Sequence, residues 1–129
     1  MSARVLPLLL AGVGSVAGAQ ATAIHREPME AADFPGNGLH TIMVRTTINP
    51  AGTVAAHTHP GLELAYVTVG TVEVTIGAAA PKRVAAGQSF QIAPHTRHIV
   101  HNAGPQAAVV VSTYIVDPAA PIATPAPAP

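Results

Sequence analysis

The sequence predicts a single all-β domain, an antiparallel sandwich or small barrel. Segments rich in Val, Ile and Thr recur between turns of Gly, Pro and Asn, which is the pattern of short strands. No segment of the middle of the chain repeats its apolar residues with a helical period. The 129 residues are enough for one compact core but too few for two catalytic domains.

The expected strands follow one another along the middle of the chain. Residues 39–48 are rich in β-branched side chains and end at the turn signature Asn49-Pro50-Ala51-Gly52. Residues 62–69 and 72–76 flank Gly70-Thr71, so we expect a tight hairpin there, and the second arm alternates apolar and polar residues as a half-buried strand does. Further short strands are expected at residues 83–85, 89–92, 98–102 and 107–116.

The N-terminus has the three parts of a secretory signal peptide, residues 1–19. Arg4 supplies a positive charge, an apolar run follows, and Ala17-Gly18-Ala19 offers small residues for cleavage before Gln20. The alternative is a membrane anchor, but Pro and Gly within the apolar run weaken it. We therefore expect a periplasmic or secreted protein with no membrane attachment after cleavage.

The remaining chain divides into three parts. Residues 20–38 are polar and contain two prolines and a Gly-Asn-Gly cluster, which predicts an irregular arm. Residues 118–129 are mostly Pro and Ala and predict a disordered tail. Residues 39–117 must then build the β-barrel domain.

The composition excludes several functions and favours one. Only 9% of residues are charged and the formal net charge is zero, so nucleic-acid binding is not expected. The absence of cysteine excludes a disulfide framework, a thiolate zinc site and a Cys nucleophile. Seven histidines stand against one lysine, and His is the commonest metal ligand.

His57, His59 and Glu63 are the candidate metal ligands that the residues themselves suggest. Residues two apart on a strand point to one face, so the two histidines can converge, and the Pro60-Gly61 turn can bring Glu63 back toward them. A mixed nitrogen and oxygen set suits Fe(II), Mn(II), Ni(II), Cu(II) or Zn(II). The alternatives are a pair of exposed turn histidines and a solvated strand carboxylate.

The same residues resemble the first motif of the cupin superfamily, which is HxH, three or four residues, Glu, six residues and Gly. Here the motif is His57-Thr58-His59, three residues, Glu63, six residues and Gly70. The family's leading Gly falls at Ala51 in this chain, and Gly52 comes one place late.

A second cupin motif is matched from Gly87 to Asn102. The overall spacing and the His98-x-x-x-Asn102 step are kept. The turn departs from the pattern, because Ala93 stands where Pro is usual and His95 replaces the turn Gly.

This resemblance implies a double-stranded β-helix, or jelly roll, holding one divalent transition metal (Zn, Cu, Fe, Mn or Ni). The implied ligands are His57, His59, Glu63 and His98, with Glu63 also the candidate catalytic residue. Independently, strand alternation places His98 and Asn102 on one face. We expect His95 and His101 to be surface residues, assign no role to His25 and His40, and expect Tyr66 and Phe90 to pack in the core.

Three functions follow as hypotheses. The first is a metal-dependent enzyme on a small organic molecule, most readily a dioxygenase-like oxidoreductase, with isomerases and lyases also known among cupins. The second is a non-catalytic module that binds a small molecule or metal; the few Lys and Arg of the barrel argue against a strongly anionic ligand. The third is a purely structural metal. We also expect a homodimer, with residues 108–111 as a contact surface or as core.

Overall fold

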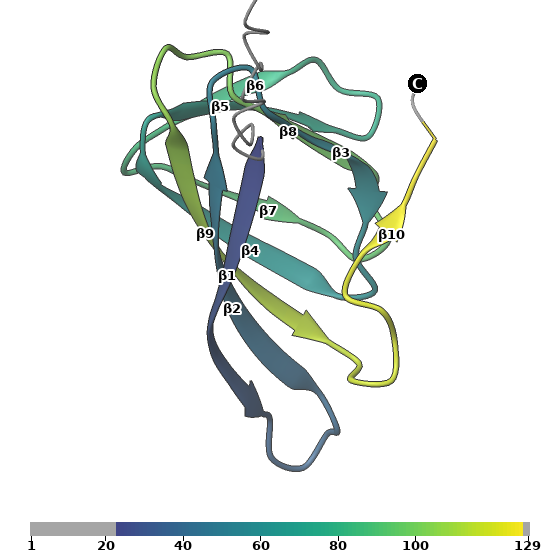
Figure 1. Cartoon of the computed structure of the whole chain (residues 1–129). Helices are drawn as coiled ribbons and strands as arrows, with labels where there is room; N and C mark the ends of the chain where they lie inside the picture. The colour runs from purple at the N-terminus through teal and green to yellow at the C-terminus, as the bar shows by residue number, and fades with distance from the viewer. Residues whose placement is uncertain (1–22, 128–129) are drawn as a thin grey trace, which may run out of the picture.

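The computed structural model describes residues 23–127, which form two antiparallel sheets facing each other (Figure 1). The first sheet runs in the order β1 (Ile24–Asp33), β2 (His40–Ile48), β9 (Ala108–Val116), β4 (Leu62–Val69) and β7 (Ser89–Ile92). The second runs β10 (Thr124–Pro125), β3 (Thr53–Thr58), β8 (His98–His101), β5 (Thr71–Ile76) and β6 (Lys82–Ala85). The predicted all-β jelly roll is confirmed.

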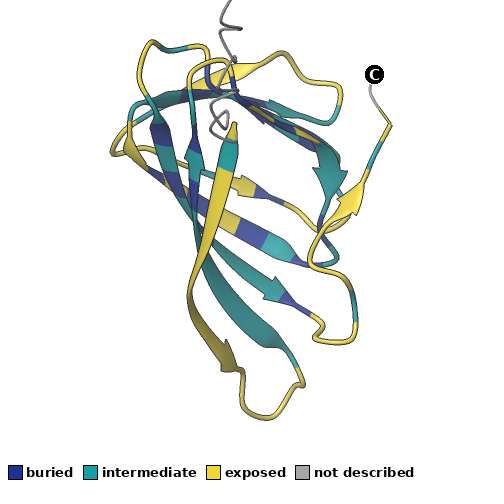
Figure 2. Ribbon diagram, viewed as in Figure 1, coloured by how far each residue is buried: buried dark blue, intermediate teal, exposed yellow. Residues whose placement is uncertain are grey.

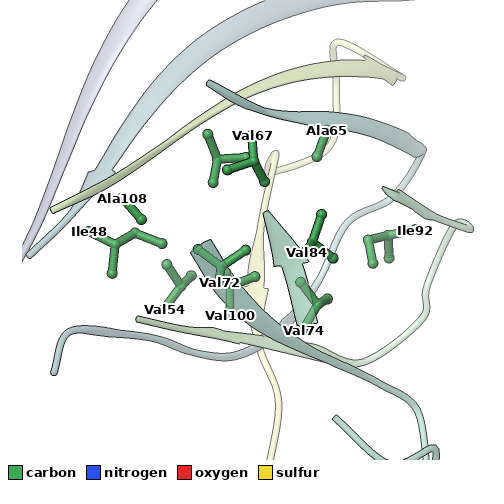
Figure 3. Close-up of a cluster of buried hydrophobic side chains, with 11 residues drawn as sticks. Ile48, Val54, Ala65, Val67, Val72, Val74, Val84, Ile92, Val100 and Ala108 are labelled. Carbon is green, nitrogen blue, oxygen red and sulfur yellow. The ribbon is translucent and has the colours of Figure 1, made fainter. Parts of the chain in front are cut away.

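The apolar core fills the space between the sheets (Figure 3). On β5, Val72 and Val74 are buried while Thr71 and Glu73, which alternate with them, are only half-buried, as the pattern predicts. Each fully buried Val or Ile contributes about 1.5–3 kcal/mol by leaving water. The core cluster consists of Ile48, Val54, Ala65, Val67, Val72, Val74, Val84, Ile92, Val100, Ala108 and Val110.

The hairpin expected at Gly70-Thr71 is wrong. β4 pairs with β7 and β9, whereas β5 pairs with β6 and β8 in the other sheet. Gly70 has φ of 72°, and a Cβ there would lie 3.0 Å from the carbonyl oxygen of Ala107. The glycine therefore lets the chain cross from one sheet to the other instead of folding back on itself.

The irregular arm expected over residues 20–38 is also wrong, because most of it is β1. This strand pairs antiparallel with β2 along its whole length, with one shift in register between Pro28 and Glu30. Ile24, at its start, packs against the core. β1 and β2 form the long hairpin at the lower end of the molecule in Figure 1.

Residues 118–127 are not a free tail, and we call them the C-terminal strap. They return along the edge of the second sheet, where β10 pairs with β3 (Figure 1). The Ala126 amide donates to the carbonyl of Ala56 at 2.9 Å, and Arg97 Nε donates to the carbonyl of Pro127 at 2.7 Å.

Burial decides two further predictions (Figure 2). Tyr66 lies on the outer face of β4 and is 49% exposed, so its expected place in the core is wrong. Phe90 does pack against the core. Ala108 and Val110 are buried in the core, which leaves only alternate residues of this part of β9 facing outward. The homodimer stays a prediction.

The expected signal peptide, residues 1–19, lies outside the described residues. Between residues 23 and 127 there is no helix long and apolar enough to cross a membrane.

Candidate metal centre

The four predicted ligands converge from both sheets at one end of the barrel. His57 lies on β3 and His98 begins β8, both in the second sheet, while Glu63 lies on β4 of the first. His59 stands in the loop that connects β3 to β4. This loop passes very close to β9, since a Cβ on Gly61 would overlap the carbonyl of Ile115.

The side chains present their Nε2 and carboxylate atoms to a common point. His57 Nε2 lies 3.2 Å from His59 Nε2. Glu63 Oε2 lies 3.1 Å from His59 Nε2 and 3.3 Å from His98 Nε2. One ligand nitrogen from each of the three histidines falls within 4.8 Å of the others, so the cluster can hold a metal ion.

Backbone carbonyls fix which nitrogen of each ring faces the centre. The Nδ1 atoms of the three rings donate to carbonyl oxygens: His57 to Ala55 at 2.7 Å, His59 to Ile122 at 2.6 Å, and His98 to Thr96 at 2.9 Å. A carbonyl oxygen only accepts, so Nδ1 carries the proton and Nε2 of a neutral ring carries a lone pair. Metal-ligating histidines are held in this way.

Burial lowers the pKa of His57 below 6.5, and the neighbouring His98 and His59 lower it further, against the raising effect of the Ala55 carbonyl. His57 is therefore neutral at neutral pH, which is the form that binds a metal.

Glu63 is a buried carboxylate with one oxygen unsatisfied. Its Oε1 accepts a hydrogen bond from Ser112 Oγ at 2.8 Å, while Oε2 is buried without a hydrogen-bond donor. Burial raises the pKa of Glu63, but hydrogen bonds and positive charge offered by His59 and His98, together with the hydrogen bond from Ser112, outweigh burial and hold the pKa well below its usual range. When both rings carry their proton on Nδ1, the Nε2 atoms offer Oε2 no proton, and a cation at this point would supply the positive charge instead.

Ser112 and Tyr114 are site residues that the sequence analysis missed. Both lie on β9 and line the same cavity as the histidines; Tyr114 is the cross-strand partner of Glu63, and its ring centroid is 4.7 Å from that of His59. Burial and the charge of Glu63 raise the pKa of Tyr114. Ser112 and Tyr114 stand two apart in an apolar strand, so alternation could have placed them on the inner face with Val110.

A cavity of about 600 Å³ is lined by the ligand cluster and by residues of β1 and β2. Its walls are mainly apolar, and the size is that of a small-molecule site. The lining includes Ile24, Val44, Ile48, Val54, Phe90, Val100, Val110 and, from the C-terminal strap, Ile122.

Asn102, the last residue of the second motif, has a structural role. Its side-chain amide is fully buried and donates to the carbonyls of Ile48 and Gln106, both at 2.8 Å, and accepts from the Gly104 amide. It therefore ties the end of β8 to the end of β2 and takes no part in the ligand cluster.

The side chains of the remaining histidines take no part in the ligand cluster, although the His95 amide donates to the carbonyl of His59 at 2.8 Å. His95 is exposed, and His101 is half-buried with its Nδ1 hydrogen-bonded to Thr53 Oγ1 at 2.7 Å. His25 is exposed on β1, and His40 pairs with Asp33 at 2.7 Å at the far end of the β1–β2 hairpin.

Two of the departures from the cupin motifs, at Ala51 and His95, have a left-handed backbone. Ala51 has φ of 63° and His95 has φ of 57°. These are the two positions where the superfamily pattern has glycine, and a residue with a Cβ strains the backbone in this conformation.

Comparison with known proteins identifies the class. Residues 44–114 match the cupin domain family, and the chain belongs to it. A search of curated proteins finds no match.

Solved structures share the fold. An uncharacterised conserved protein with a double-stranded β-helix domain from Klebsiella pneumoniae subsp. pneumoniae MGH 78578 is 20% identical, with TM-score 0.68 over 83% of this chain and 82% of that one. Recombinant oxalate oxidase in complex with glycolate is 23% identical, with TM-score 0.65, covering 83% of this chain and 57% of that one. KdgF from Halomonas sp. is 22% identical, with TM-score 0.57 over 71% and 78%. The chain thus spans little more than half the length of the oxalate oxidase.

Proposed function

We propose that this chain is an exported cupin that binds one divalent transition metal through His57, His59, Glu63 and His98, and that it acts on a small organic molecule as a metal-dependent enzyme. The observation that carries the proposal is the unsatisfied Glu63 Oε2, which meets the Nε2 atoms of His59 and His98 at 3.1 and 3.3 Å. Nitrogen and carboxylate donors of this kind suit Zn, Cu, Fe, Mn and Ni.

A metal of this class supplies Lewis acidity and, where it is redox-active, electron transfer. The chain's own residues do the rest. Apolar walls exclude water from the cavity, and Ser112 orients the Glu63 carboxylate through its 2.8 Å hydrogen bond. The Tyr114 hydroxyl, whose raised pKa keeps it protonated, lines the cavity and can donate a hydrogen bond to a ligand there.

A dioxygenase-like oxidoreductase is the first reaction class in this proposal. One structural neighbour is an oxalate oxidase whose structure holds glycolate, a small hydroxy acid. The fold supports many chemistries, and KdgF and a DMSP lyase share it as well. The reaction class is therefore tested by turnover and not by fold.

A non-catalytic binding module is the second candidate, favoured by the scarcity of proton-transfer groups. Apart from the four ligands, Arg26 and Tyr114 are the titratable side chains that line the cavity among residues 23–127. Turnover of a screened substrate that is lost in the Glu63→Ala and Tyr114→Phe proteins would favour the enzyme. Binding of the same molecule by the wild type and both variants, with turnover in none of them, would favour the binding module.

The test of the metal site is elemental analysis of the protein recovered from the periplasm, beside His57→Ala and His98→Ala variants. We expect near-stoichiometric metal in the wild type and its loss in both variants. Metal at background level in all three would overturn the proposal.

Export adds an expectation about the ion. A chain that folds outside the cytoplasm selects its metal by intrinsic affinity, which favours Cu and Zn. We expect Zn or Cu in periplasmic protein, and Fe or Mn in protein expressed without residues 1–19. The same ion in both preparations would contradict this part of the proposal.

A further inference from the structure

Arg26 is a cavity residue that the sequence placed outside the domain. It lies on β1, the strand that replaces the expected irregular arm, and it lines the cavity that contains the histidine cluster. It is the only lysine or arginine among the described residues that line this cavity.

Arg26 is an exposed residue of the edge strand β1, and the strand register places it on the face of the first sheet that lines the cavity. Its cross-strand partner on β2 is Thr46, whose partner on β9 is Val110. Thr46 and Val110 are both buried between the sheets, and cross-strand partners share a face. The next residue, Glu27, faces the opposite side, where it forms a 3.0 Å ion pair with Arg45.

The Arg26 guanidinium has no anionic partner inside the described part of the chain. Between residues 23 and 127 it makes no recorded hydrogen bond or ion pair, in contrast to Arg45 on the outer face. Its charge reaches the ligand end of the cavity, since it lowers the pKa of Tyr114 against the larger raising effect of burial. Ile24 and Val44 form apolar walls around it.

We propose that Arg26 binds the carboxylate of the small molecule that enters this cavity, so that the ligand is an apolar monocarboxylic acid. A guanidinium pairs with a carboxylate through two parallel hydrogen bonds, and a single guanidinium matches a single negative charge. The inference rests on the proposed small-molecule site and names its ligand class.

The dimensions of the site define the ligand further. β1 and β4 are three strand spacings apart, about 14 Å, and the register sets Arg26 level with Val67, four residues along β4 from Glu63. A molecule that contacts both Arg26 and the ligand cluster therefore needs an apolar body between its carboxylate and its other end. The apolar side chains of Val44 and Val110 line the cavity along this path and provide the complementary walls.

The test compares an acid with its uncharged amide. Binding of 3-phenylpropionate and 3-phenylpropionamide is measured by calorimetry on the metal-loaded wild type and on the Arg26→Gln and Arg45→Gln variants. We expect the wild type to bind the acid about tenfold or more tightly than the amide. Arg26→Gln should bring the two affinities together. Arg45→Gln removes the same charge from the outer face of the neighbouring strand and should keep the preference.

The same measurement on metal-free protein separates this inference from the proposed function. A metal can attract a carboxylate by itself, so a preference that survives Arg26→Gln, or a wild type without preference, overturns the role of Arg26. A preference that persists without metal and disappears in Arg26→Gln supports it. Absence of metal in the elemental analysis, with the Arg26-dependent preference intact, overturns the proposed metal enzyme alone.

Discussion

Glu63 is a buried carboxylate of which one oxygen, Oε2, has no hydrogen-bond donor in the metal-free protein. Oε2 lies against imidazole nitrogens whose protons point away, to backbone carbonyls. Glu63→Gln removes the charge and adds an amide that can donate to an Nε2 atom. Because an unsatisfied buried polar group costs about 1–3 kcal/mol, we expect the metal-free variant to be more stable than wild type by up to this amount.

The same substitution should weaken metal binding, because a neutral amide is a poorer ligand than a carboxylate. Thermal unfolding with and without added Zn²⁺ measures both effects: a higher melting temperature without metal and a smaller rise on its addition. Ser112→Ala is the matched control, since it removes a hydrogen bond from Oε1 and leaves the charge. A Glu63→Gln protein less stable than wild type without metal would contradict this account of Oε2.

Ala51 and His95 are positions where glycine should stabilise the fold. Each has a positive φ, a conformation that costs an L-residue with a Cβ about 1–2 kcal/mol. Part of this gain is lost to the greater freedom of glycine in the unfolded chain. We expect Ala51→Gly and His95→Gly each to raise the free energy of unfolding by about 0.5–1 kcal/mol in urea titrations.

The control for these variants is Ala79→Gly, in an exposed turn where φ is not positive. There glycine brings only the entropic cost, so stability should fall slightly. A fall of the same size in all three variants would show that the backbone at positions 51 and 95 carries no strain.

At the residue scale, the four candidate ligands could be predicted because their chemistry is local in sequence. His57, His59 and Glu63 are brought together by one strand and one turn, and His98 by the spacing of a second motif. Ser112 was missed because a serine in an apolar strand has no distinctive chemistry until its partner is known. That partner, Glu63, is 49 residues away in the chain.

At the element scale, the C-terminal strap supports a metal ligand. The carbonyl of Ile122 accepts the Nδ1 proton of His59 at 2.6 Å, and the strap is held by β10 and by Arg97. Hydrogen bonds of this kind fix the orientation of a ligating ring. We expect deletion of residues 118–129 to weaken Zn²⁺ binding about 10–100-fold, measured by competition with a chelating dye.

The control is a shorter truncation that removes only residues 128 and 129. It keeps every contact described for the strap. Circular dichroism checks that both truncated proteins keep their sheets. Unchanged Zn²⁺ affinity in the longer deletion would show that the Ile122 carbonyl does not hold His59 for binding.

The elements that the sequence missed are those whose pairing depends on the backbone. All of β1 after Ile24 is exposed, so it shows no alternation of buried and exposed residues, and β10 is a two-residue strand in a Pro- and Ala-rich segment. Edge strands are held by main-chain hydrogen bonds, which any residue but proline can make. The same limit explains the false hairpin, because Gly70 favours a turn without determining which sheet the next strand joins.

At the scale of the whole molecule, the ligand cluster joins the two sheets. His57 and His98 belong to the second sheet and Glu63 to the first, so a bound metal would tie one sheet to the other. The apolar core is a separate set of side chains that also spans both sheets (Figure 3). The two sources of stability are therefore expected to act independently.

This separation predicts the effect of removing the metal. Because the core stays buried without it, we expect the chelator-treated protein to remain folded, with its strand content unchanged by circular dichroism. Metal that binds only the folded state adds about 2.7 kcal/mol at a free concentration one hundred times its Kd. The urea concentration at the midpoint of unfolding should therefore be higher with Zn²⁺ than without it, while the slope of the unfolding free energy against urea concentration stays the same. In His98→Ala the midpoint should not change on addition of Zn²⁺. Complete unfolding on chelation would instead identify the metal as a structural one that the small core requires.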